Sequence, residues 1–67
     1  MTKAEAIKAT GYTERELIYL GLIAMKNRMK QAREENPADF DHYDRLVKAY
    51  DKMMVECKAE LVKEGLA

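Results

Sequence analysis

The only histidine of the chain, His42, lies in an acidic segment with Asp39, Asp41 and Asp44. Imidazole nitrogen and carboxylate oxygen are common ligands of zinc, so this segment is the first place to look for a metal site. On a helix only Asp39, three residues before His42, would share its face, and two ligands do not complete such a site. We therefore expect an exposed helical turn whose carboxylates suit the helix dipole, with no metal and no other cofactor.

The single cysteine, Cys57, is the other side chain with intrinsic reactivity. It has no second cysteine for a disulfide and no histidine beside it to form a thiolate pair. The sequence also has no Ser-His-Asp set and no glycine-rich phosphate loop. We therefore expect a buried, structural cysteine in a protein that is not an enzyme. A lone cysteine favours a reducing, cytoplasmic location.

Four tyrosines occur in two pairs, each with a spacing of seven residues. The pairs are Tyr12 with Tyr19 and Tyr43 with Tyr50. Amphipathic aromatic rings often anchor cores and interfaces, so packing is favoured over a dedicated ligand stack.

The 67 residues include 12 basic and 12 acidic side chains, so the formal net charge is zero. This balance lacks the positive field of a typical nucleic-acid or acidic-membrane binder. A local basic block holds Lys26, Arg28, Lys30 and Arg33, but acidic residues follow it across the next turn. We expect much of this charge to pair within the chain and to set the pairing direction of the helices. No membrane association is predicted, because the longest apolar run, residues 17–25, is about half of the ~20 residues that cross a bilayer.

Residues 6–20 resemble the generic helix-turn-helix pattern of DNA-binding proteins. Gly11 stands at the turn, Thr13 at the cap of a second helix, and Leu17 and Leu20 at apolar positions of that helix. The resemblance implies a DNA-binding regulator, which is the alternative function. Against it, the would-be recognition helix opens with residues 14–16, two of them glutamates, and carboxylates facing phosphates weaken binding.

The elements that position these residues are predicted to be three helices in a single domain spanning residues 1–67. They extend over approximately residues 3–9, 14–35 and 37–64. Gly11 suits the left-handed conformation that ends the first helix, and Thr13 with Glu16 forms a capping box for the second. Asn36 and Pro37 close the second helix and open the third, with Asn36 as its predicted N-cap.

Apolar residues repeat with alternating steps of three and four, which is typical of packed helices. The predicted seam of the third helix is Phe40, Tyr43, Val47, Tyr50, Met54, Cys57 and Leu61, and that of the second helix is Ile18, Leu22, Met25, Met29 and Ala32. The short link at Pro37 makes the two helices antiparallel. The predicted fold class is therefore all-α, an antiparallel helical hairpin with a short N-terminal helix.

The first half of the second helix is apolar on all sides, because residues 17–20 and 22–25 are hydrophobic throughout. The short first helix can cover only part of it, so we expect the hairpin to dimerise into a four-helix bundle. The predicted function is a small protein–protein interaction module, acting as a regulator, adaptor or inhibitor, with itself and possibly another protein as partner. The predicted interface residues are Leu17, Tyr19, Leu20, Ile23, Ala24, Leu46 and Met53.

Overall fold

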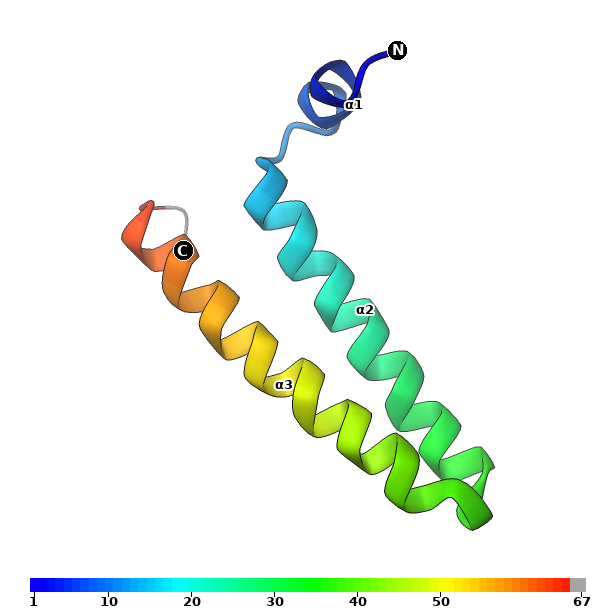
Figure 1. The fold of residues 1–67 in the computed structure, drawn as a ribbon. Helices are drawn as coiled ribbons and strands as arrows, with labels where there is room; N and C mark the ends of the chain where they lie inside the picture. The colour runs from blue at the N-terminus through cyan, green and yellow to red at the C-terminus, as the bar shows by residue number, and fades with distance from the viewer. Residues whose placement is uncertain (66–67) are drawn as a thin grey trace.

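The computed structural model describes residues 1–65, which form three α-helices and one 3₁₀ turn (Figure 1). The helices are α1 (Lys3–Thr10), α2 (Glu14–Glu35) and α3 (Phe40–Lys63), and the turn η1 (Pro37–Asp39) joins the last two. No strand occurs in this part of the chain. The long helices α2 and α3 lie side by side and run in opposite directions, which confirms the predicted all-α hairpin.

The break between α1 and α2 forms as predicted. Gly11 ends α1 in the left-handed region, with φ of 78°, which a residue without a β-carbon adopts at little cost. The backbone N–H of Thr13 donates to Glu16 Oε1 at 2.9 Å, and the backbone N–H of Glu16 donates to Thr13 Oγ1 at 3.2 Å. These two hydrogen bonds are the capping box, and they satisfy donors that would otherwise be unpaired at the start of α2.

The break between α2 and α3 differs from the prediction in its capping. Asn36 makes no side-chain cap for the helix that follows it. Its side-chain amide instead donates to the Ala32 carbonyl at 2.8 Å, so Asn36 completes the end of α2. The chain then makes a tight turn in which the Asp39 N–H donates to the Asn36 carbonyl at 2.9 Å. The 3₁₀ geometry of this turn explains why the third α-helix begins at Phe40 and not at Pro37.

The hairpin is a single layer of helices. The molecule measures 43 × 29 × 13 Å, and its smallest dimension is about the diameter of one helix with its side chains. Within residues 1–65 only Val47, Cys57 and Leu61 are buried, and all three belong to α3. A layer one helix thick covers each long helix on one side only, so most apolar side chains stay in contact with solvent.

Helix α1 projects beyond the open end of the hairpin and does not lie along α2 (Figure 1). The Lys3 ammonium pairs with the Glu14 carboxylate at 2.8 Å between these two helices. Only Ile7 of α1 is half-buried, and the other residues of the helix are exposed. The partial cover that the sequence predicted for α2 therefore does not extend along the hairpin.

Candidate interaction surface

The predicted seam of α3 is confirmed over most of its length. Val47, Cys57 and Leu61 are buried, and Tyr43, Tyr50 and Met54 are half-buried. Phe40 is the exception, because half of its surface is exposed. The guanidinium of Arg33 lies 5.4 Å from the Phe40 ring centroid, a cation–π contact at the hairpin end.

The predicted seam of α2 is confirmed at Leu22, Met29 and Ala32, which are half-buried, and it is wrong at the other two positions. Ile18 is 50% exposed and Met25 is exposed, although both were placed in the seam. The half-buried positions on the side that meets α3 again alternate by four and three, and they are Arg15, Tyr19, Leu22, Lys26, Met29 and Arg33. Relative to the prediction the helix is turned about its axis by roughly 60°, taking 3.6 residues per turn.

Two basic residues lie on the side of α2 that meets α3. Lys26 forms an ion pair with Asp51, and Arg33 donates to Asp44 Oδ1 at 2.6 Å, so two cations of α2 reach across to α3. Long basic side chains can lay their methylene groups along the seam and still present their charge at its edge. Two of the four cations of the basic block, Lys26 and Arg33, therefore pair within the hairpin.

Asp44 is the most heavily paired carboxylate of the hairpin. Lys48, one turn later on α3, contacts its second oxygen at 2.9 Å, while Arg33 contacts the first. The hydrogen bond from Lys48, followed by that from Arg33, lowers the pKa of Asp44 below the usual value for aspartate. Asp44 therefore contacts Arg33 of α2 and Lys48 of α3 at the same time, near the closed end of the hairpin.

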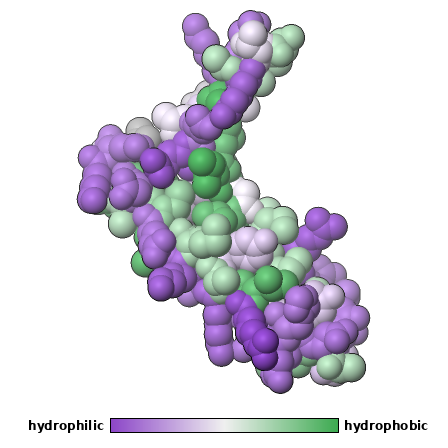
Figure 2. All heavy atoms as spheres, viewed as in Figure 1, coloured by the Kyte–Doolittle hydropathy of each residue, from purple (hydrophilic) through white to green (hydrophobic). Residues whose placement is uncertain are grey.

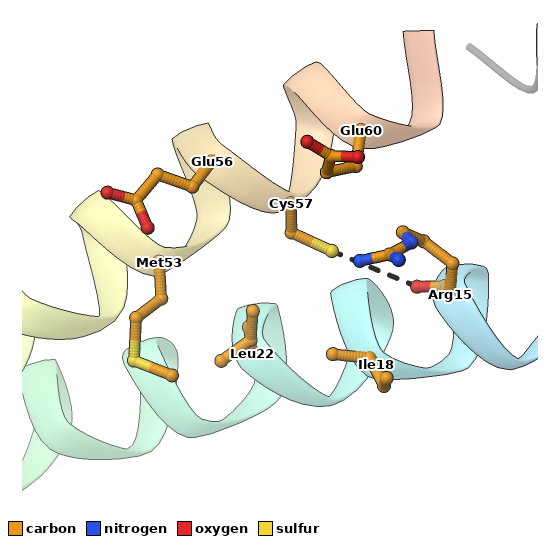
Figure 3. A pocket seen from close by; sticks show the side chains of 7 residues that line it. All are labelled: Arg15, Ile18, Leu22, Met53, Glu56, Cys57 and Glu60. Atoms are coloured by element: carbon orange, nitrogen blue, oxygen red, sulfur yellow. Dashed lines mark hydrogen bonds between the residues drawn. The ribbon is translucent and has the colours of Figure 1, made fainter. Parts of the chain in front are cut away.

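An open groove of about 480 Å³ runs between the two helices near their open end. Arg15, Ile18 and Leu22 of α2 face Met53 and Cys57 of α3 across it, and Glu56 and Glu60 stand on its α3 rim (Figure 3). The Cys57 thiol points into the hairpin and lies 3.9 Å from the Arg15 carbonyl oxygen, a weak contact. Cys57 is buried and free, as its seam position predicts.

Hydrophobic side chains collect along the line between the two helices, and hydrophilic ones form the rims (Figure 2). The band is continuous with the open groove and is not closed over by any other element of residues 1–65. This band is therefore the candidate interaction surface of the described residues.

The seven predicted interface residues do not share one surface. Met53 lines the open groove, whereas Tyr19 lines a different pocket with Met54, Val55 and Lys58. Leu46 lies seven residues before Met53, on the same side of α3. The remaining four are on α2: Leu20 and Ala24 are exposed, and Leu17 and Ile23 are half-buried. Ile18, which was assigned to the seam, is a surface residue that the sequence pattern missed.

The other candidate residues lie apart from this band. His42 is exposed, and its ring meets the Tyr43 ring edge-on at 5.1 Å between centroids. Residues 1–65 contain no group of three side chains that could hold a metal ion. In the segment that resembles a helix-turn-helix, Arg15 pairs with Glu64 at 3.4 Å, so its cation is turned toward α3.

None of the helices in the described residues is both long enough and apolar enough to cross a membrane. Comparison of the chain with protein-family models, with curated proteins and with solved structures gave no match.

Proposed function

We propose that this chain is a small protein–protein interaction module that acts as a homo-oligomeric helical bundle, in the role of a regulator, adaptor or inhibitor. The observation that carries the proposal is the single-layer hairpin, which leaves an apolar band without cover. Stable helical domains bury such a band against a second layer of structure. In this proposal the second layer is another hairpin.

The exposed area supports the same proposal. The chain exposes 5122 Å², whereas a compact monomer of 7.7 kDa exposes about 4,300 Å². The radius of gyration is 14.6 Å, compared with about 11 Å for a compact chain of this length. The excess of roughly 800 Å² is close to the area that each partner contributes to a standard protein–protein interface.

The distribution of charged groups also favours protein binding over nucleic-acid binding. The cations Lys26 and Arg33 are paired with carboxylates of α3, and Lys3 and Arg15 are paired with Glu14 and Glu64. A cation that already has a carboxylate partner contributes less to phosphate binding, because that pair must be broken first.

Light scattering after gel filtration tests the proposal on the full chain at micromolar concentration. We expect a mass of at least twice 7.7 kDa together with a strongly helical circular dichroism spectrum. A folded monomer under the same conditions would contradict self-association.

A further inference from the structure

The two faces of the hairpin layer differ in chemistry. One face, here called the apolar face, consists of Ile18, Leu22 and Met25 of α2 and of Leu46 and Met53 of α3. Ile18, Leu22 and Met53 line the open groove together. Met25 follows Ile18 by seven residues, and Leu46 precedes Met53 by seven, so both continue the same sides of their helices. Ile18 and Met53 expose 50% and 48% of their surface.

The opposite face carries the ion pairs that link the helices. Asp51 pairs with Lys26, and it lines the pocket on that side together with Tyr19, Met54, Val55 and Lys58, so this face carries both ion pairs and apolar side chains. Asp44 lies seven residues before Asp51, so its pair with Arg33 continues the same side of α3. Covering this face would remove water from the two interhelical ion pairs, whereas the charged groups of the apolar face stand at its rim.

Charges at the rim of the apolar face have both signs. Arg15 stands on α2, while Glu56 and Glu60 stand on α3 across the groove (Figure 3). A strongly basic or acidic partner would fit a rim of one sign. A surface with both signs suits a copy of itself, because a two-fold axis brings each patch onto its own equivalent.

We infer that a second copy of this chain packs on the apolar face, with the ion-paired face turned to solvent in both copies. The inference rests on the proposed self-association and adds to it the surface that mediates it. A second copy also suits the exposed area of the whole chain, since an excess of roughly 800 Å² is half of a standard two-sided interface. Two layers of two helices then make a four-helix bundle with the apolar faces as its core.

Two double variants of the full chain test this assignment by light scattering and circular dichroism. Ile18→Glu with Met53→Glu places two carboxylates on the apolar face, and Val55→Glu with Val62→Glu is the matched control. Val55 and Val62 are seven residues apart on the side of the opposite pocket, and they are 65% and 54% exposed. We expect the first variant to fall to the mass of one chain and the control to keep the mass of the parent.

Other outcomes distinguish an error in the assigned surface from an error in the proposed self-association. If the parent is an oligomer and the first variant keeps its mass, the apolar face is not the interface, while the proposed function stands. Loss of mass in the control overturns the assignment in the same way. A monomeric parent instead contradicts the proposed function and this inference together.

Alkylation of single cysteines provides a second measurement that does not depend on a folded glutamate variant. In a Cys57→Ala background, Met53→Cys and Val55→Cys place a thiol on the apolar face and on the opposite face. At a concentration about a hundred times the dissociation constant, we expect position 53 to react roughly tenfold more slowly than in dilute protein. The thiol at position 55 is expected to react at the same rate in concentrated and in dilute protein. Protection of position 55 in place of position 53 would assign the interface to the opposite face.

Discussion

Lys26 of α2 pairs with Asp51 of α3 across the hairpin. The residue just before Lys26 is Met25, which the apolar pattern predicts to lie in the seam. This pair and the Arg33–Asp44 pair lie on one side of the interhelical contact. Met25 and Ile18 consequently turn to the other side, where they are exposed. The orientation of α2 that forms these ion pairs is also the one that leaves Ile18 and Met25 exposed.

The Lys26–Asp51 pair should orient the helices while adding little stability. Its side chains are 24% and 56% exposed, so water and salt screen the attraction. In a double-mutant cycle with Lys26→Ala and Asp51→Ala we expect a coupling free energy of about 0.2–1 kcal/mol, smaller at high salt. Urea unfolding at a fixed protein concentration measures it. A cycle of Lys52→Ala with Asp51→Ala is the control, and a coupling there of equal size would contradict a specific pair.

Leu61 and its neighbour Val62 should respond very differently to truncation. Leu61 is 3% exposed in the seam, whereas Val62 projects to solvent. We expect Leu61→Ala to lower the free energy of unfolding by about 2–5 kcal/mol, through lost burial and the cavity left behind. Val62→Ala should change it by no more than about 0.5 kcal/mol. Thermal and urea melts at one concentration compare the two. Similar losses in both would mean that the end of α3 is not packed against α2 as described.

The capping box at Thr13 should contribute to the stability of α2. Thr13→Ala removes the acceptor of the Glu16 N–H and leaves that donor to water, at a cost of about 0.5–2 kcal/mol. Thr13→Ser keeps the hydroxyl and should restore most of the loss. Helicity at 222 nm and the melting midpoint report both effects. If the serine variant is no better than the alanine variant, the hydroxyl is not the source of the stability.

Asp44 should make part of the stability pH-dependent. Its pKa is lowered in the folded chain by Lys48 first and by Arg33 second. Because its pKa is lowered, the folded chain binds fewer protons at Asp44 than the unfolded chain does, so the stabilisation is present above the usual aspartate pKa. It is lost as the pH falls through the lower, folded pKa. Nuclear magnetic resonance titration of the carboxyl carbon should show a low pKa that rises in Lys48→Gln. An unchanged pKa in that variant would contradict the assigned cause, and Lys52→Gln serves as the control.

Leu20 and Ile23 distinguish the interface that the sequence predicts from the apolar face. The sequence pattern places both residues in the interface. If that interface forms, the double variant Leu20→Glu with Ile23→Glu should split the assembly. With the apolar face as the contact, this variant should keep the parent's mass, because Leu20 is 46% exposed and lies off that face. Gel filtration with light scattering on the parent and on the double variant decides between the two surfaces. A variant that is monomeric but still helical would instead support the interface that the sequence predicts.

Most local features of this fold follow from the sequence alone, and the N-cap predicted at Asn36 is the exception. Gly11 readily adopts the left-handed conformation that ends α1, and Pro37 interrupts the long helical pattern. The side chains of Thr13 and Glu16 can each accept a hydrogen bond from the other residue's backbone N–H. Each depends on groups a few residues apart, so no distant contact can alter it. The three-and-four spacing on α3 likewise predicts its buried side, because that helix has a single continuous apolar stripe.

Only the tertiary structure decides which side of α2 meets α3. The first half of that helix is apolar all round, so residues 17–25 offer several equivalent stripes and their pattern cannot choose among them. In the orientation that forms, Lys26 and Arg33 pair with Asp51 and Asp44, which lie 25 and 11 residues away along the chain. Pairs this distant meet only once the hairpin has closed. Their geometry then leaves Ile18 and Met25 on the surface, because a helix is rigid and turning one side inward turns the other outward.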